Sequence, residues 1–185
     1  MLAYVFWHWR RPTATATDYE AAQRRFHAAL AEAPPAGFAR SFSVAFRGAP
    51  WAAGGGEAYE DWYLVDGSAA LDPLNAAAIS ASRQSPHDAA AALAAGGTAG
   101  LYSLRHGAPV VTPAVLTWFA KPDGVTYRDF FATLEPVVGQ AAAALWCRNM
   151  TLGPALEFCI HAKQAVALPP SVVPLAIGCR AVWPM

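Results

Sequence analysis

Charged side chains are scarce in this sequence, and neither sign prevails. Only 14% of the 185 residues are charged, with 13 basic and 13 acidic side chains, so the formal net charge at pH 7 is zero. Proteins that bind nucleic acids or anionic membranes usually carry a basic excess, because the phosphate groups of these partners attract it. We therefore expect neither a nucleic acid nor a membrane as a partner.

Long apolar runs are also missing, although 55% of the residues are hydrophobic. No uninterrupted run approaches the roughly 18 residues that a membrane-spanning helix needs. The first apolar run is short and precedes Arg10 and Arg11, whereas a secretory leader carries its positive charges in front of that run. We predict a cytoplasmic protein without a membrane-spanning helix.

The usual metal and nucleotide motifs are absent as well. The cysteines, Cys147, Cys159 and Cys179, form no CxxC motif and no Cys–His pair at zinc spacing. The histidines are scattered along the chain, so we predict no metal site. There is no P-loop, GxGxxG, GxSxG or HExxH motif, which removes the common signals for nucleotide binding, serine hydrolysis and zinc proteolysis.

What the chain does contain is a regular succession of strand and helix signals. The stretch "YVFWHWRRP" at residues 4–12 is rich in aromatic residues and stops at a proline, which is typical of a strand. Five further elements follow: a helix from Thr17 or Asp18 to the prolines at 34–35, strands over 37–48 and 59–67, a helix over 85–95 ended by Gly96 and Gly97, and a strand over 99–107. This β-α-β-β-α-β order is that of a ferredoxin-like unit.

The pattern starts again in the second half of the chain. An offset of 110 residues aligns Val5, Phe6, Trp9, Arg11 and Pro12 with Val115, Leu116, Phe119, Lys121 and Pro122. Prolines at 169, 170 and 174 leave no room for a full second helix in this half. We predict an α+β fold of two tandem ferredoxin-like units, 1–110 and 111–185. Their antiparallel sheets would pack as a pseudo-dimeric barrel, with the second unit lacking a full second helix.

Two such units with aromatic-rich first strands resemble the dimeric α+β barrel superfamily. The group includes antibiotic-biosynthesis-type monooxygenases, stress-responsive barrel proteins, muconolactone isomerases and haem-binding chlorite dismutase-like proteins. The resemblance covers nearly the whole chain and rests on element order and the repeat. It implies a barrel that one chain completes by itself, as a monomer or within a homodimer, and often a pocket in each half.

Strand alternation sorts the first strand into two faces. One face carries Tyr4, Phe6, His8 and Arg10, and the other carries Val5, Trp7 and Trp9. The face with His8 favours a pocket, where the imidazole would transfer a proton, and the other face favours packing under the helices. The alternative is that His8 lies near a strand end and is simply solvated.

Isolated polar residues within the later strands extend this candidate site. Arg105 is predicted to be catalytic together with His8, because the fork of an arginine binds anionic oxygen. The predicted ligand-binding residues are Tyr4, Phe6, Arg10, Trp62, Arg148, His161 and Arg180. The alternative is that the charged residues form outward-facing ion pairs and the large aromatic residues belong to the core.

Together these observations predict a small-molecule-binding α+β barrel whose partner is a small apolar or aromatic ligand. It would be a cofactor-independent enzyme, monooxygenase- or isomerase-like, on an aromatic or polyketide-like compound. One alternative is a non-catalytic stress-response or assembly module with a filled barrel. Another is a haem-binding protein, for which His161 is the best axial candidate in the second half of the chain.

Overall fold

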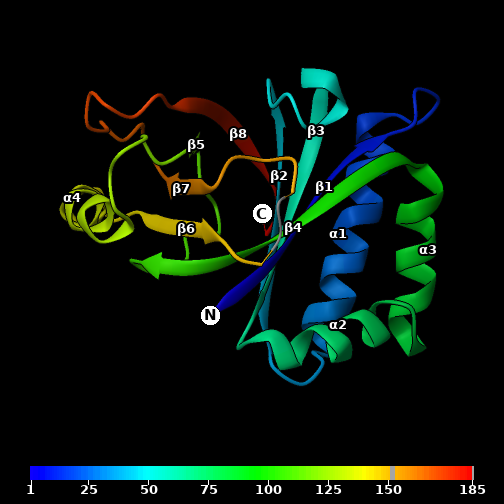
Figure 1. The fold of residues 1–185 in the computed structure, drawn as a ribbon. Helices are drawn as coiled ribbons and strands as arrows, with labels where there is room; N and C mark the ends of the chain where they lie inside the picture. The colour runs from blue at the N-terminus through cyan, green and yellow to red at the C-terminus, as the bar shows by residue number, and fades with distance from the viewer. Residues whose placement is uncertain (151–152, 185) are drawn as a thin grey trace.

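Eight antiparallel strands close into a single barrel in the computed structural model, which describes residues 1–150 and 153–184 (Figure 1). Around the barrel the strands follow the order β1-β3-β2-β8-β5-β7-β6-β4, and β4 pairs with β1 to close it. The strands are β1 (Leu2–Arg10), β2 (Phe38–Arg47), β3 (Glu57–Val65), β4 (Ala94–His106), β5 (Val115–Phe119), β6 (Ala144–Arg148), β7 (Phe158–Ala162) and β8 (Leu175–Trp183).

The predicted fold of two tandem ferredoxin-like units with separate sheets is wrong. All eight strands belong to one hydrogen-bonded sheet, because β2 pairs with β8 and β4 pairs with β6 across the predicted division. Backbone hydrogen bonds at the strand edges join the first and second parts of the chain directly, so no sheet edge is left for face-to-face packing. The predicted boundary between residues 110 and 111 falls in the connection from β4 to β5, and the division into domains stays a prediction.

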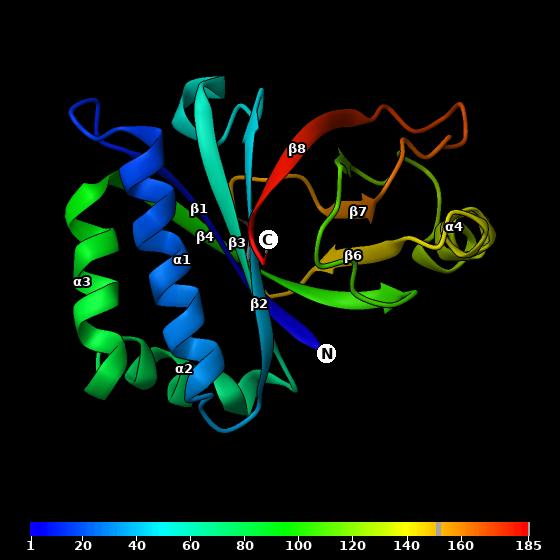
Figure 2. The same cartoon turned by 180° about the vertical axis from the view of Figure 1, so that it is seen from behind.

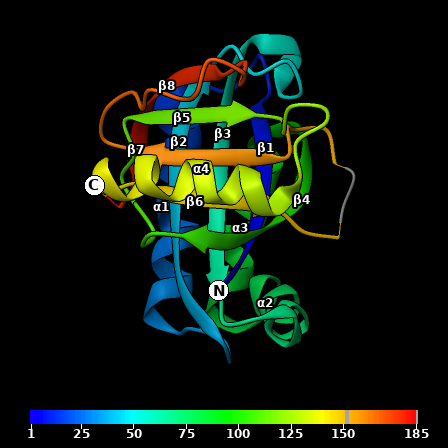
Figure 3. The same ribbon diagram turned by 60° about the vertical axis from the view of Figure 1, so that its left-hand side comes forward.

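The four α-helices lie outside the barrel on two opposite sides (Figure 2). Three of them, α1 (Ala16–Glu32), α2 (Leu71–Ala78) and α3 (Gln84–Leu93), gather on the side of β1, β3 and β4. On the other side α4 (Tyr127–Gln140) lies over β6 and β7 (Figure 3) and packs through Phe130, Leu134 and Val138. None of the helices in the described residues is long and apolar enough to cross a membrane.

Large aromatic side chains fill the inside of the barrel. Trp7, Trp62, Trp118, Trp146 and Tyr102 are all fully or almost fully buried there. Their rings meet at centroid distances of 5.0 to 6.2 Å, mostly edge to face, which suits the aromatic quadrupole. An eight-stranded barrel has an interior just wide enough for side chains to fill, so this packing leaves a core in place of a channel.

This packing reverses the predicted orientation of the first strand. Val5 and Trp7, expected to pack under the helices, belong to the barrel core. Tyr4 and Phe6 are on the outer face and pack beneath α1 and α2. Both faces of β1 are covered, one by the barrel core and one by helices, so its hydrophobic pattern does not distinguish inside from outside.

The N-cap of α1 lies two or three residues before the predicted position, Thr17 or Asp18. Thr15 is the N-cap, and its hydroxyl oxygen accepts a hydrogen bond from the backbone N–H of Asp18. The buried positions Tyr19, Gln23, Phe26 and Leu30 then recur at helical spacing and face the sheet.

Gly96 and Gly97 do not end a helix, as predicted, but lie inside β4. A Cβ atom at Gly97 would collide with the Phe6 ring and would lie 2.9 Å from the backbone oxygen of Trp7. A Cβ atom at Gly96 would meet the Trp9 ring at 2.8 Å. The two glycines therefore make room for aromatic side chains from the neighbouring strand β1.

Gly97→Ala is accordingly expected to lower the free energy of unfolding by about 2 kcal/mol, because the backbone of Trp7 cannot yield as a side chain could. Denaturant unfolding of the purified variant measures this effect. The matched control is Gly178→Ala in β8, where a new Cβ atom has nothing within 4 Å. Equal stability of the two variants would contradict the expectation.

Candidate active site

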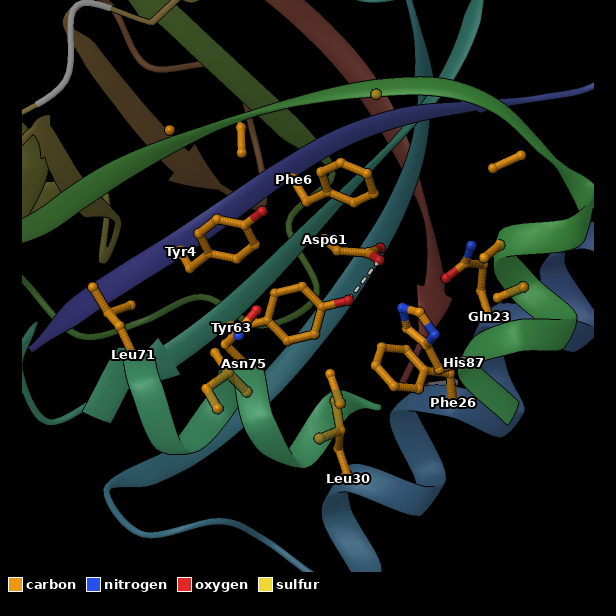
Figure 4. A pocket seen from close by; sticks show the side chains of 18 of the residues that line it. Tyr4, Phe6, Gln23, Phe26, Leu30, Asp61, Tyr63, Leu71, Asn75 and His87 are labelled. Atoms are coloured by element: carbon orange, nitrogen blue, oxygen red, sulfur yellow. Dashed lines mark hydrogen bonds between the residues drawn. The ribbon is translucent and has the colours of Figure 1, made fainter. Parts of the chain in front are cut away.

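A cavity of about 850 Å³ lies between the outer face of the sheet and the three helices on that side (Figure 4). Strands β1, β3 and β4 form its floor, and α1, α2 and α3 form its walls. The side chains that define it include Tyr4, Phe6, Tyr19, Gln23, Phe26, Leu30, Asp61, Tyr63, Leu74, Asn75, His87 and Leu101, with alanines and glycines of α3 and β4. A largely apolar cavity of this size with a few polar groups is typical of small-molecule sites.

The polar groups of the cavity centre on the buried carboxylate of Asp61 in β3. Its Oδ2 atom accepts a hydrogen bond of 3.0 Å from the Tyr63 hydroxyl (Figure 4). The same atom lies 3.1 Å from Nε2 of His8 and 3.3 Å from Nε2 of His27. Among the described residues none offers a hydrogen bond to Oδ1, the second carboxylate oxygen. Three polar side chains therefore lie close to Oδ2 of Asp61, whereas Oδ1 has no hydrogen-bond partner among the described residues.

Strand register and helix phase bring this cluster together. In the β1–β3 pair Phe6 lies opposite Asp61 and His8 opposite Tyr59, so His8 and Asp61 are diagonal neighbours on one face. His27 reaches the same carboxylate from α1. The Nδ1 atom of His27 forms a hydrogen bond of 2.8 Å with the hydroxyl of Ser41 in β2.

The electrostatics keep Asp61 ionised. Burial opposes its charged form, but the imidazoles of His8 and His27 that face the carboxyl hold its pKa well below its usual value. Burial and the charge of Asp61 raise the pKa values of Tyr63 and Tyr19, so both phenols keep their protons at neutral pH. The cluster therefore combines a fixed anion with phenol groups that can donate hydrogen bonds.

His8 connects the carboxylate to the cavity through Tyr19. Its ring is stacked between Phe6 and Tyr59, at centroid distances of 5.1 and 5.6 Å, which fixes the plane of the imidazole. In the tautomer with its proton on Nε2, which faces ionised Asp61, His8 accepts a hydrogen bond at Nδ1 from the Tyr19 hydroxyl, 2.6 Å away. Asp61, His8 and Tyr19 then form a chain along which a proton can pass from the cavity.

A second pair of buried ionisable groups lies inside the barrel. Glu60 accepts hydrogen bonds from the indole N–H groups of Trp7, at 2.6 Å, and Trp62. Burial raises the pKa of Glu60 to about 7, although the two indoles oppose that rise. Burial likewise lowers the pKa of His161 to about 3, and neither of its ring nitrogens has a hydrogen-bond partner among the described residues.

The structure brings only part of the predicted site together. Tyr4 and Phe6 line the cavity and His8 lies directly behind it, fully buried and not solvated. Trp62 and His161 contact each other inside the barrel, with ring centroids 4.3 Å apart.

The four predicted arginines lie apart from this cluster. Arg10 pairs with Glu57 at 3.0 Å, and Arg180 pairs with Glu20 on α1. Arg148 donates to the backbone oxygen of Ala155 at 2.9 Å. Arg105 covers the ring of Phe131 on α4, on the opposite side of the molecule from the cavity (Figure 1).

Tyr19, His27, Asp61 and Tyr63 are not among the site residues predicted from the sequence. Tyr63 alternates with Trp62, and the structure places Tyr63 at the cavity, whereas Trp62, the predicted ligand-binding residue, belongs to the barrel core. The helical spacing of Tyr19, Gln23 and Phe26 was the available signal for the wall that α1 contributes. Nothing local linked His27 to Asp61, because they are far apart in sequence and meet only across a helix–sheet contact.

His161 does not fit the role of a haem ligand. It is enclosed in the barrel by the rings of Trp62, Phe42 and Trp146 and does not line the cavity. Within residues 1–150 and 153–184 there is also no group of three or more His, Cys, Asp or Glu side chains arranged to hold a metal ion.

Two solved structures share this architecture. One is a crystal structure from Fusobacterium nucleatum subsp. nucleatum described as a "Putative monooxygenase", with a TM-score of 0.66 and 7% sequence identity over 98% of this chain and 92% of the other. The other is an "anthrone oxidase-like protein", with a TM-score of 0.51 and 11% identity over 97% of this chain and 90% of the other. No family model matches the sequence, and no curated protein matches it.

These neighbours share the barrel fold of this chain, and membership of the dimeric α+β barrel superfamily stays a prediction. At 7% and 11% sequence identity this structural similarity shows a shared fold and does not show a shared function. The chemistry has to be argued from the side chains of this chain.

Proposed function

We propose that this protein is a cofactor-independent enzyme of the monooxygenase or oxidase type that deprotonates a small aromatic compound in the cavity under α1, α2 and α3. The observation that carries the proposal is the chain Asp61–His8–Tyr19, whose last member faces an apolar cavity of about 850 Å³. The names of the two structural neighbours support the same reaction class.

The proposed first step is a proton transfer from the substrate. Tyr19 accepts an acidic proton from the bound compound while its own phenol proton moves to Nδ1 of His8. The resulting imidazolium is stabilised by Asp61, whose carboxylate lies 3.1 Å from Nε2. Tyrosinate never has to accumulate, which agrees with the raised pKa of Tyr19. The same arrangement of carboxylate, imidazole and hydroxyl activates nucleophiles in hydrolases.

The second step uses O2 as the co-substrate. The deprotonated compound is electron-rich and reduces O2. When an activated ring CH2 is converted to a carbonyl, one oxygen atom enters the product and the other leaves as water with the two hydrogens. Atoms and electrons balance without an added reductant, so no bound cofactor is required. An isomerase would use the same deprotonation and return the proton to another carbon without consuming O2.

A hydroxyanthrone is the probe for this proposal, because it is planar, has a CH2 group between two rings and carries an O–H group that can donate a hydrogen bond. The wild-type protein is expected to consume O2 and form the corresponding anthraquinone, and Tyr19→Phe is expected to lower kcat by about 100-fold because the relay loses the hydroxyl that faces the cavity. The measurements are O2 uptake and product absorbance. The matched control is Tyr127→Phe, which removes an exposed phenol on α4 and should leave the rate unchanged.

Absence of turnover by the wild type, or equal rates for the wild type and Tyr19→Phe, would contradict the proposal. Conversion of anthrone-like probes without O2 uptake would favour the isomerase.

A non-catalytic scaffold is the second candidate function, and a specific observation favours it. The inside of the barrel is packed with side chains of Trp7, Trp62, Trp118 and Trp146, as expected of a filled barrel. The cavity outside the barrel and the buried Asp61 cluster favour the enzyme, because a scaffold has no need of an ionised carboxylate with a free oxygen.

A further inference from the structure

The charged groups of the cavity are acidic. Asp61 lies at its buried floor and Asp72 on α2 at an exposed position of its wall. None of the described residues that line the cavity is an arginine or a lysine, and His87 is the only histidine there. An anionic ligand would therefore enter without a basic partner and approach a carboxylate in a poorly solvated space.

The flanking arginines are engaged elsewhere. Arg10 is held by Glu57 and by the backbone oxygen of Ala14, at 3.0 and 2.7 Å. Arg83 donates to the backbone oxygens of Ala77 and Ala33. Reorienting either side chain toward the cavity would sacrifice hydrogen bonds that it already makes.

The Oδ1 atom of Asp61 is an unsatisfied hydrogen-bond acceptor among the described residues. It is buried, it has no partner among the described residues, and its carboxylate lines the cavity (Figure 4). Buried carboxylate oxygens are nearly always satisfied, and an ionised one makes the stronger class of hydrogen bond. A ligand O–H or N–H group can supply this bond, whereas a ligand carboxylate or a bare ether cannot.

We infer that this cavity selects uncharged or cationic aromatic compounds that carry an O–H or N–H donor, which Asp61 binds through Oδ1, and that it rejects carboxylated analogues. The inference rests on the proposed function, namely that the cavity binds an aromatic compound. The sequence predicted an arginine that binds an anionic oxygen of the substrate. The described residues that line the cavity include Asp61 and Asp72 but no arginine, so the cavity disfavours such an anion.

Three naphthalene derivatives of similar size test the selection by isothermal titration calorimetry at pH 7. Naphthol is neutral and has a donor, methoxynaphthalene is neutral without a donor, and naphthoate is an anion. Naphthol is expected to bind about tenfold more tightly than methoxynaphthalene, because only naphthol can donate a hydrogen bond to Asp61. It is expected to bind at least about tenfold more tightly than naphthoate.

The variant Asp72→Asn separates charge from shape. Removing this carboxylate is expected to reduce the preference for naphthol over naphthoate about threefold, an effect that salt also weakens because Asp72 is exposed. Asp123→Asn removes an exposed carboxylate from the connection between β5 and α4, away from the cavity, and should leave the preference unchanged.

The outcomes distinguish this inference from the proposed function. Equal binding of naphthol and methoxynaphthalene, or naphthoate binding as tightly as naphthol, would overturn the selectivity while an aromatic compound still binds. If none of the three probes binds, the proposed function and the inference that rests on it both fail.

Discussion

Asp61→Asn is expected to lower the free energy of unfolding by about 3 to 5 kcal/mol and to lower kcat by at least about 100-fold. Asparagine has nearly the same shape but no charge. The two histidines that face Oδ2, His8 and His27, would lose the anion that they approach at 3.1 and 3.3 Å. In the relay, no carboxylate would remain to stabilise the imidazolium that forms when His8 takes the proton of Tyr19.

Denaturant unfolding at several pH values measures the stability part of this prediction. The pKa of Asp61 is lower in the folded protein than in the unfolded chain. Its charge therefore adds stability above about pH 4, and this contribution is lost as the pH falls below that value. The variant should lack this part of the acid dependence.

Asp123→Asn, at an exposed site, is the control and should change neither quantity. A fully active and equally stable Asp61→Asn protein would contradict both the cluster and the relay.

His161→Leu is expected to protect the protein against acid. In the folded protein burial lowers the pKa of His161 to about 3, from an ordinary value of 6.5. Between these values the unfolded chain binds a proton that the folded protein does not, so acidification favours unfolding. The difference between 6.5 and about 3, at about 1.4 kcal/mol per pH unit, gives about 5 kcal/mol lost by pH 3. Leucine cannot bind this proton.

Glu60 acts in the opposite direction. Its folded pKa of about 7 lies above the ordinary 4.5, so the folded protein holds a proton that the unfolded chain has released. Stability from this group is complete below about pH 4.5 and falls by about 3 kcal/mol as the pH rises through 7. The two interior groups together place the stability maximum between about pH 4.5 and 6.5.

Unfolding free energies measured from pH 3 to 8 test the interior pair. His161→Leu should flatten the acid side of the profile, and its stability at pH 7 should change by less than about 1.5 kcal/mol because the volumes are similar. His87→Gln removes a more exposed histidine on α3 and serves as the control, with the acid side unchanged. If the unfolding free energy of His161→Leu falls with acid as steeply as that of the wild type, the burial of His161 does not govern acid unfolding.

Strand alternation was the part of the site that sequence could predict. Because successive side chains point to opposite faces, Tyr4, Phe6 and His8 had to share a face wherever the strand lay. The structure places Tyr4 and Phe6 at the cavity and His8 directly behind them. The choice of Trp62 over Tyr63 in β3 shows the limit of this reasoning, since alternation says that the two diverge but not which one points inward.

The helix boundaries show another limit. Glycine pairs commonly end helices, yet Gly96 and Gly97 continue β4 because the rings of Trp9 and Phe6 occupy the space where their Cβ atoms would be. That requirement comes from β1, which lies far away in the sequence, so no local pattern could reveal it.

By itself the sequence determined the strand-rich α+β character and which residues share each strand face. Tertiary structure alone decided that the eight strands close into one barrel, which face of each strand became the interior, and that His8, His27 and Asp61 meet. The physical reason is that both faces of β1 and β3 are covered, by the barrel core on one side and by helices on the other. Hydrophobicity then no longer distinguishes the faces, and only strand register and closure do.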